Sequence, residues 1–310
     1  MNEFELIARL TRSLPVNPAV VTGPGDDCAV LDLGVPGKRF LFKTDAVVEG
    51  VHFTRDTPPE KIGRKALARG LSDLAAMAGA PIAALVTLAL PKTFDPDFIA
   101  AIYDGMNALA RQYGVAIVGG ETTTNPERIL ISIALLGSAD PGKIPLRTGA
   151  QVGDAIFVTG TLGGSVAGKH LDFEPRLAEA AWLVDHVPVH AMIDVSDGLA
   201  GDLRHLLKGA GVGATLRKSS IPVSLAAKQR ARTSSTAKPP LIAALTDGED
   251  FELLFTVAAG DAVKLLDGWR EKFPPTKLTC IGKIVAGAGI LLHDQHGSQT
   301  FNGDGYVHFA

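Results

Sequence analysis

The stretch KIGRKALARGLSDLAAMAGAPIAALVTLAL (Lys61–Leu90) holds an Ala-rich segment followed by a short apolar run. The first part predicts a long helix that ends at Gly79 and Pro81, because glycine and proline stop helices. The run IAALVTLALP predicts a buried strand, since its apolar residues are nearly continuous. A helix that leads into a buried strand is typical of α/β and α+β domains.

The alternation of helices and strands continues in both directions from this stretch. RFLFKTDAVV (Arg39–Val48) predicts a strand that runs into a turn, and Asp95–Gly114 predicts a helix with an acidic start and a glycine stop. MIDVSDGLAGDLRHLLKGAG predicts a turn and then a helix, and the polar, breaker-rich Lys228–Pro240 predicts a surface loop. Further helices are expected in 2–13, 164–171 and 174–187, and strands in 115–120, 128–137, 155–160, 251–257 and 278–284.

The length of 310 residues predicts two domains, because single cores usually stop growing at about 250–300 residues. The loop-like Pro141–Gly153 is the expected boundary, which gives domains at 1–145 and 146–310. The expected fold class is therefore α/β or α+β, with a mixed sheet and flanking helices in the first domain and an α/β second domain.

Composition narrows the class of protein. Hydrophobic residues make up 46% and charged residues 20%, as in soluble globular proteins, and the net charge of −3 gives no basic field for nucleic acid or membrane. Cys28 and Cys280 are far apart, which predicts neither a disulfide framework nor a zinc cluster. The acidic, amphipathic start does not resemble a signal peptide, and no apolar run is long enough for a membrane span. We therefore expect a cytoplasmic location.

The stretch GGSVAGKH (Gly163–His170) has the spacing G-x-x-x-x-G-K of a phosphate-binding P-loop. A P-loop continues with Ser or Thr, whose hydroxyl ligates Mg²⁺, whereas this stretch continues with His170. A P-loop site also needs a downstream Asp, which MIDVSD offers only in a different pattern. We favour a glycine turn that begins a helix, with Lys169 in solvent; a nucleotide-binding loop is the alternative.

Acidic residues recur beside Gly, Ser or Thr, close to apolar strands or helix starts. Convergent carboxylates without a matching set of Cys or His suit Mg²⁺, which would bind a polyphosphate through metal bridges. A simpler interpretation of each acid alone is a helix cap or turn residue. The acids concerned are Asp26, Asp27, Asp45, Glu49, Asp73, Glu121, Asp194, Asp197, Glu249 and Asp250.

Taken in order, these clusters resemble the thiamine-monophosphate kinase family. That family belongs to the superfamily of aminoimidazole ribonucleotide synthetase, selenophosphate synthetase and the hydrogenase maturation factor HypE. The resemblance spans Phe4 to Phe309. The matching elements are FELIARL, GDDCAVL, TDAVVEGVHF, LSDLAAM, GGETT, VTGTLG, IDVSDGL, GEDFELLF and GYVHF.

The resemblance implies transfer of a phosphoryl group from ATP to thiamine monophosphate, with several Mg²⁺ ions. It also implies a homodimer that pairs through the first domain, and a second domain that closes the active-site cleft. GTLGGSVAGK is then a glycine turn after the first strand of the second domain, and ATP binds at the acidic motifs. The alternatives are another ATP-using synthetase of the superfamily, or a sensor that binds nucleotide or thiamine phosphate without turnover.

Site residues follow from the positions that match the family. Catalytic roles are implied for Asp45, Asp73 and Arg147. The implied metal ligands are Asp26, Thr44, Asp45, Asp73, Glu121, Asp194 and Asp197. Gly120, Glu121, Arg147 and Ser196 are implied to contact ATP, and His52, Glu249 and Tyr306 to hold the thiamine substrate. The chemistry agrees, because an aromatic ring and an acid suit a cationic thiazolium.

Two positions depart from the family pattern. The family usually has Asp where Glu121 stands and Ser where Lys43 stands. We expect the longer Glu121 side chain to ligate the metal at a slightly longer reach than Asp would. At Lys43, we expect one metal contact to be lost or to be supplied by the backbone carbonyl.

Overall fold

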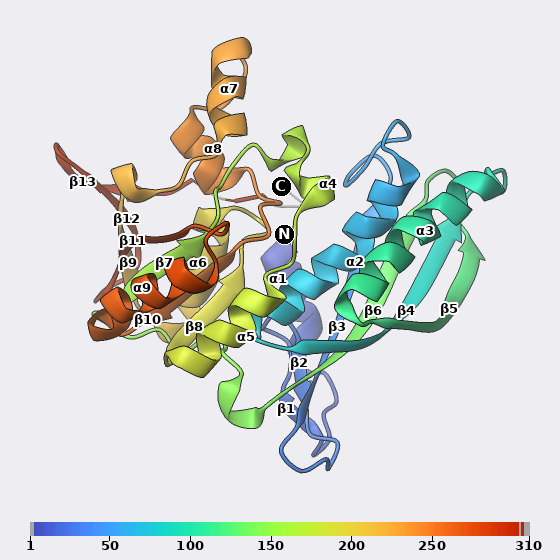
Figure 1. Ribbon diagram of the computed structural model, residues 1–310, viewed down its shortest axis with the longest axis horizontal. Coiled ribbons are helices and arrows are strands. Elements are labelled where there is room, and N and C mark those ends of the chain that lie inside the picture. Colours follow the sequence, from blue (N-terminus) through green and yellow to red (C-terminus); the bar gives the residue numbers. More distant parts are fainter. Residues whose placement is uncertain (1–2, 304, 307–310) are drawn as a thin grey trace.

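The structure, a computed structural model, describes residues 3–303 and 305–306 of the 310-residue chain (Figure 1). Its strands form two separate sheets, joined by the segment between Ala139 and Ala155. The expected mixture of helices and strands is confirmed. Among the helices of the described residues, none combines the length and apolar character that a membrane span needs.

The first sheet has six strands in the order β1-β2-β3-β6-β4-β5, and β4 and β5 are the parallel pair. Alternate strand residues, such as Ile131, Ile133 and Leu135, are buried beneath α2 and α3, which cover one face of the sheet (Figure 1). The elements of this half are α1 Glu3–Thr11, β1 Val20–Thr22, β2 Ala29–Leu31, β3 Arg39–Val48, α2 Pro59–Ala76, β4 Ala80–Leu90, α3 Pro96–Tyr113, β5 Ala116–Thr124, β6 Leu130–Ala139 and the 3₁₀ turn Pro141–Lys143.

Local sequence explains why α2 and α3 form and pack closely. The Asp95 side chain accepts a hydrogen bond from the Asp97 amide and caps α3, which ends at Gly114 in a left-handed conformation. A Cβ at Gly63 would lie 1.8 Å from the Ile102 carbonyl oxygen, and one at Gly105 would lie 1.9 Å from that of Glu60. Only glycine allows the two helix backbones to approach this closely.

The second sheet has seven strands in the order β13-β12-β9-β11-β7-β10-β8. Phe157 and Phe255 face a core that includes α5 and α9, whereas Ile156 and Leu254 face a core on the opposite side that includes α6 and α8. The helices of this half are α4 Lys169–Asp172, α5 Leu177–His186, α6 Leu199–Ala210, α7 Leu225–Thr233, α8 Pro240–Thr246 and α9 Ala262–Lys272, with 3₁₀ turns at Ser165–Ala167, Lys218–Ser220 and Ala259–Asp261. The strands are β7 Ala155–Thr159, β8 Val189–Asp194, β9 Gly213–Arg217, β10 Leu253–Val257, β11 Leu278–Val285, β12 Gly289–Asp294 and β13 Gly297–Phe301.

Two sequence predictions about this half were wrong or incomplete. The predicted surface loop Lys228–Pro240 begins inside a helix, because α7 starts at the capping residue Ser224 and continues through Ala, Lys, Gln and Arg. The predicted turn before α6 is preceded by the short strand β8, which lies at the edge of the sheet beside β10. Strands β9, β12 and β13 were not predicted. The domain boundary at residue 145 stays a prediction.

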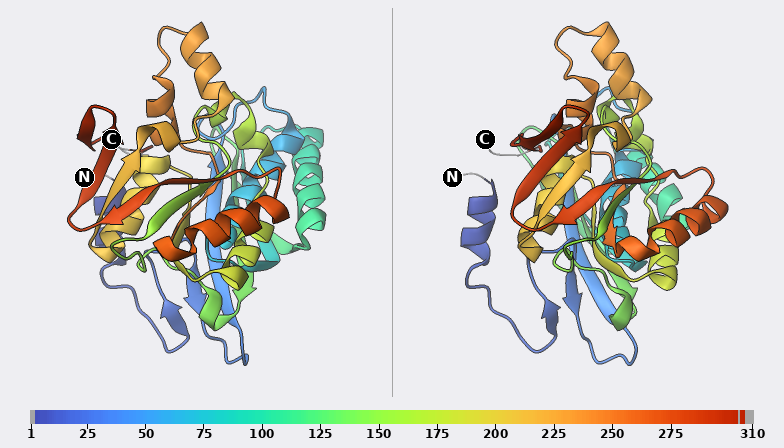
Figure 2. Two further views of the ribbon diagram at one scale, coloured as in Figure 1. Left: turned by 60° about the vertical axis from the view of Figure 1, so that its left-hand side comes forward. Right: turned by 90° about the vertical axis from the view of Figure 1, so that its left-hand side faces the viewer.

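Helix α2 joins the two halves. Its Lys61 Nζ lies 2.6 Å from Asp172 Oδ2, and its Arg64 donates to Glu174 and to the Phe173 carbonyl. Further along the helix, Ser72 Oγ donates to Asp194 Oδ2 at 2.6 Å. Residues spread over about three turns of α2 therefore contact the second half. Figure 2 shows the two sheets and their helices from two further directions.

Candidate active site

Three buried carboxylates meet where the two halves of the molecule touch. Asp27 precedes β2, Asp73 lies in α2 and Asp194 ends β8. One carboxylate oxygen of each lies within 4.8 Å of the others. The three side chains come from segments far apart in the sequence, so the fold alone brings them together.

The cluster is electrostatically unfavourable without a cation. Burial and the neighbouring Asp27 raise the pKa of Asp194 to about 7, although Ser72 and Lys43 oppose the shift. Burial and neighbouring carboxylates also raise the pKa of Asp73 well above its usual range, although Lys43 opposes the rise. Asp27 Oδ2 is buried and has no hydrogen-bond partner among the described residues. A set of oxygen donors with an unpartnered buried oxygen fits a hard divalent cation such as Mg²⁺.

Arg147 contacts both Asp27 of this cluster and its neighbour in the sequence, Asp26. Asp26 Oδ2 accepts a 3.0 Å hydrogen bond from the Arg147 amide, while the Arg147 guanidinium forms an ion pair with Asp27. The side chain that meets Asp73 and Asp194 is thus Asp27, which the family resemblance did not single out. The GDD motif contained both acids, but nothing in the sequence distinguished which one points toward Asp73.

Lys43 lies next to the same cluster. Its Nζ is 3.2 Å from Asp73 Oδ2. At this position the family usually has Ser, so an ammonium group stands where a hydroxyl is expected. Lys43 supplies part of the positive charge that the carboxylates need.

A small pocket of about 150 Å³ lies at the same junction, on the α2 side of the first sheet. It brings together five predicted site residues from four motifs. Its walls contain both acidic and basic groups, together with the aromatic side chain of Tyr306. The lining residues are Val51, His52, Arg69, Val166, Ser196, Asp197, Asp247, Glu249 and Tyr306.

Glu249 is held in this pocket by two basic side chains. Lys65 Nζ lies 2.6 Å from Glu249 Oε1, and His170 Nδ1 lies 3.2 Å from Oε2. Burial opposes ionisation, but His170 and Lys65 outweigh it and lower the pKa of Glu249 to about 2. Glu249 and Phe251 both have positive φ angles, of 54° and 51°. Such backbone strain concentrates at functional sites.

Sequence reasoning missed three residues of this site: Lys65, Arg69 and His170. Arg69 binds Asp45 through Nε and Nη2, at 2.8 and 3.2 Å. The available signal was helical spacing, because Lys65, Arg69 and Asp73 are four residues apart and share one face of α2. That face is the one turned toward the pocket and the acidic cluster.

His52 is neutral in the pocket. Its Nδ1 accepts a 3.1 Å hydrogen bond from the Val48 amide, so its ring proton is on Nε2. Burial, with Arg69 and Lys65 nearby, lowers the pKa of His52 to about 4. His52 therefore presents an uncharged ring at neutral pH.

The glycine-rich stretch is not an open phosphate cradle. Its amides already bind carboxylates of this chain: Gly163 N donates to both oxygens of Asp250, and Gly164 N donates to Asp247. The expected glycine turn after a strand is confirmed, since β7 ends at Thr159 and Gly160 has φ of +58°. The expectation that Lys169 faces solvent was wrong, because its Nζ lies 2.8 Å from the buried Glu252.

Of the seven predicted metal ligands, Asp73 and Asp194 belong to the acidic cluster and the other five do not. Thr44 and Glu121 have exposed side chains, and their strand positions alternate with those of Lys43 and Asp45 that face α2. They lie on the face of the first sheet that none of the described helices covers (Figure 1). Gly120 has a packing explanation, because a Cβ there would lie 1.8 Å from the Val86 carbonyl oxygen.

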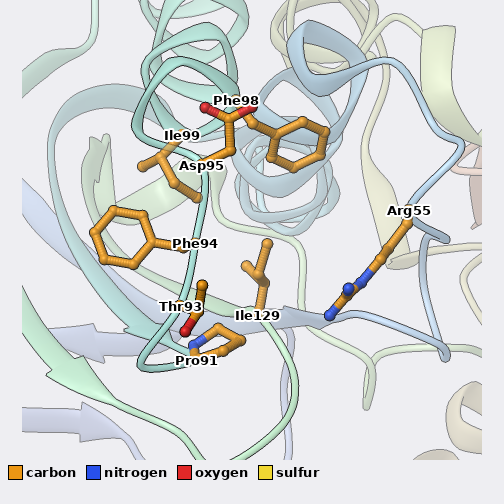
Figure 3. Close-up of a pocket in the computed structure, with 8 residues that line it drawn as sticks. All are labelled: Arg55, Pro91, Thr93, Phe94, Asp95, Phe98, Ile99 and Ile129. Atoms are coloured by element: carbon orange, nitrogen blue, oxygen red, sulfur yellow. The ribbon is translucent and has the colours of Figure 1, made fainter.

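A larger pocket of about 470 Å³ lies near the start of α3. Its lining is mostly apolar, and Figure 3 shows Phe94 and Phe98 on one side with Arg55 on the other. The Arg55 guanidinium already pairs with Glu49. None of the predicted site residues lines this pocket, so it does not suit phosphoryl transfer.

Comparison with known proteins shows which family the chain resembles. Residues 25–139 match the family model described as AIR synthase related protein, N-terminal domain. The chain is 42% identical to a thiamine-monophosphate kinase from Rhodopirellula baltica, over 90% of this chain and 87% of that protein. It is 36% identical to one from Salmonella typhimurium, over 99% and 98% of the two chains.

Solved structures give the same result. AaThiL complexed with AMPPCP and TMP superposes with a TM-score of 0.79 at 31% identity, covering 99% of this chain and 97% of that one. The fold alone is shared with Escherichia coli HypE, a hydrogenase maturation protein, at a TM-score of 0.73 and 22% identity, over 96% and 97% of the chains. The likeness to the thiamine-monophosphate kinases, in contrast, combines 31% identity or more with 90% or more of this chain, so it shows the family as well as the fold. The chain belongs to the thiamine-monophosphate kinase family.

Proposed function

We propose that this protein transfers the γ-phosphoryl group of ATP to thiamine monophosphate, which yields thiamine diphosphate and ADP. The observation that carries the proposal is the position of the buried Asp27–Asp73–Asp194 cluster at the same domain junction as the pocket that contains Glu249 and Tyr306. Family membership supports it, as does the relative whose structure holds AMPPCP, an ATP analogue, together with TMP.

The acidic cluster would hold Mg²⁺, with Asp27, Asp73 and Asp194 as ligands. When bound, the cation would neutralise phosphate charge and align the two anions. We propose Asp26, Asp45 and Asp197 as further ligands near the cluster. Thr44 and Glu121 remain part of the proposed metal shell through the family resemblance, although they lie on the other face of the sheet.

The pocket residues suit a cationic, aromatic substrate that carries a phosphate. Glu249 is ionised and pairs with positive charge, Tyr306 offers a ring for stacking, and His52 is an uncharged hydrogen-bonding group. We propose that Gly120, Ser196 and Arg147 contact ATP. The acceptor oxygen of thiamine monophosphate is already anionic near neutral pH, so the reaction needs alignment more than a general base. We propose direct in-line transfer without a phosphoenzyme.

The test is a reaction of purified protein with ATP, Mg²⁺ and thiamine monophosphate, followed by chromatography of the thiamine phosphates. Metal-dependent thiamine diphosphate in equal amount to ADP supports the kinase. Free thiamine and a chelator serve as controls. Binding of both ligands without product would instead identify a sensor, and absence of both binding and product would refute the proposed substrate.

We also propose that the protein is a homodimer that pairs through the uncovered face of the first sheet. Phe42 and Leu85 lie on that face with 48% and 47% of their surface exposed. Exposed apolar side chains gathered on one sheet face mark an interface. Such pairing would place Thr44 and Glu121 at the interface.

Analytical ultracentrifugation tests the dimer. A Phe42→Glu, Leu85→Glu variant should sediment as a monomer, because two buried charges would oppose pairing. Val263→Glu is the matched control, since Val263 is 71% exposed in α9 of the other half. A wild-type monomer, or a double variant that still dimerises, would refute the proposed interface.

A cytoplasmic location is the last part of the proposal. Cys28 and Cys280 are both free thiols, which suits a reducing compartment. Cell fractionation with an antibody against the chain tests the location, and recovery outside the cytoplasmic fraction would refute it.

A further inference from the structure

We infer that Arg69 binds the phosphate group of thiamine monophosphate and thereby makes the pocket select the monophosphate over free thiamine. The inference rests on the proposed function and names a residue that the sequence did not single out. Three features of the pocket carry it: its charges, the position of Arg69, and the hydrogen-bond donors that Arg69 keeps.

The first feature is charge. Among the nine described residues that line the pocket, three carry carboxylates: Asp197, Asp247 and Glu249. Arg69 is the one permanent cation of this lining set, because His52 is neutral at pH 7. A substrate with a cationic ring and an anionic phosphate needs both signs of charge. Glu249, the acid proposed to contact thiamine, suits the ring, and Arg69 suits the phosphate.

The second feature is position. Arg69 lies between Asp45 and Glu249, at 2.8 Å from Asp45 Oδ2 and 3.5 Å from Glu249 Oε1. Asp45 is a proposed metal ligand and Glu249 a proposed thiamine contact. A phosphate bound by Arg69 would thus lie between the part of the site that holds the thiamine ring and the part that binds metal and ATP. The acceptor phosphate of the reaction belongs at this place.

The third feature is the set of donors. A guanidinium has five N–H groups, and Asp45 takes the side-on pair formed by Nε and Nη2. Three N–H groups remain, one on Nη2 and two on Nη1, and among the described residues they meet only the long 3.5 Å contact of Nη1 with Glu249. An end-on pair of N–H donors matches two phosphate oxygens. Arg69 can therefore bind phosphate without leaving Asp45.

Lys65 provides the contrast on the same helix face. It is 1% exposed, and its ammonium contacts Glu249 Oε1, the His52 carbonyl and His170 Nδ1. Two of the three ammonium N–H groups are taken by the Glu249 carboxylate and the His52 carbonyl, and the third is buried beside His170, at a position that does not line the pocket. Lys65 holds Glu249 in place, whereas Arg69 has donors to offer.

The test compares two ligands in two proteins. Calorimetric titrations with thiamine monophosphate and with thiamine, in the presence of Mg²⁺ and AMPPCP, are run on wild type and on Arg69→Met. The variant should bind thiamine monophosphate about tenfold or more weakly and thiamine within twofold of wild type. In steady-state assays its KM for thiamine monophosphate should rise while its KM for ATP stays unchanged.

Arg64→Met is the matched control. Arg64 lies on α2, is 18% exposed against 15% for Arg69, and also pairs with a carboxylate, that of Glu174. It does not line the pocket, so its variant should keep the preference for thiamine monophosphate. Arg69→Lys keeps the charge without the paired donors and should lose only part of that preference.

The outcomes separate this inference from the proposed function. If Arg69→Met loses affinity for thiamine monophosphate and for thiamine equally, Arg69 only holds Asp45 and Glu249 in place, and the inference is overturned. Unchanged affinity for thiamine monophosphate in an active, folded variant would overturn it as well. If wild type binds neither ligand and forms no thiamine diphosphate, the proposed function fails and the inference fails with it.

Discussion

The glycine-rich turn at Gly163–Gly164 and the cluster of Asp27, Asp73 and Asp194 differ in how their polar groups are satisfied. The turn has the spacing of a phosphate-binding loop, but its amides bind Asp247 and Asp250 of the same chain. The cluster has no recognised metal-binding spacing in the sequence, yet it leaves Asp27 Oδ2 buried without a partner among the described residues.

The difference shows that satisfaction of hydrogen bonds is a better guide to a ligand site than motif spacing. The glycine amides already use their donors within the chain and have little to gain from a phosphate, whereas a buried carboxylate oxygen without a partner gains much from a cation. The following predictions test this contrast between the closed glycine turn and the open acidic cluster.

The largest effect is expected from Asp73→Asn in the acidic cluster. Loss of one carboxylate should lower kcat about 100- to 1000-fold, because phosphate charge would be less well neutralised. The metal-free variant should also melt at a higher temperature than wild type, since repulsion among the carboxylates is relieved. Turnover and melting curves with and without Mg²⁺ measure both effects. The exposed Asp104→Asn in α3 is the control, and a fully active Asp73→Asn would contradict the proposed metal site.

The pH dependence of stability should be next in size. The pKa of Asp194 is raised to about 7, so the folded chain keeps a proton that the unfolded chain loses near pH 4. Stability of metal-free wild type should therefore fall, relative to Asp194→Asn, as pH rises from about 4 to about 7, by about 3 kcal/mol. Urea unfolding of both proteins in chelator measures the difference. A difference that does not change with pH would count against the strained cluster.

Lys169→Met should give a smaller effect, and on stability alone. The substitution removes one of the cations that neutralise the buried Glu252, while Arg176 remains bound to it at 2.8 Å. We expect a loss of about 1–3 kcal/mol in the free energy of unfolding and turnover within threefold of wild type. A P-loop lysine would behave in the opposite way. Loss of turnover in a stably folded variant would revive the nucleotide-loop interpretation.

Lys43→Ser should produce the smallest effect. Lys43 Nζ lies 3.2 Å from Asp73 Oδ2 and competes with a metal ion for that carboxylate. Its removal should tighten Mg²⁺ binding several-fold, because the carboxylates would be neutralised by metal alone. Mg²⁺ titrations followed by melting temperature measure this shift. Weaker Mg²⁺ binding in the variant would show that Lys43 supports the site instead.

The sequence was informative where local rules decide the structure. The strand in Arg39–Val48 was predicted, although it continues through the turn expected at its end, and the helix Asp95–Gly114 was predicted with its acidic start and its glycine stop. Short strands such as β8 (VHAMID) and β9 (GATLR) were missed because five or six residues of mixed polarity beside a helix carry no distinct period. The helix α7 was missed because polar residues after Ser224 look like a loop until something packs against them.

The sequence by itself determined the α/β class, the order of the acidic motifs and the resemblance to a kinase family, because periodicity, caps and motif order are properties of the linear chain. Only the tertiary structure decided that Asp27 rather than Asp26 meets Asp73 and Asp194, and that Lys65, Arg69 and His170 belong to the site. The tertiary structure also decided that the amides of the glycine turn bind Asp247 and Asp250. The reason is that side-chain direction and hydrogen-bond satisfaction depend on contacts between segments far apart in the chain, and no local pattern encodes them.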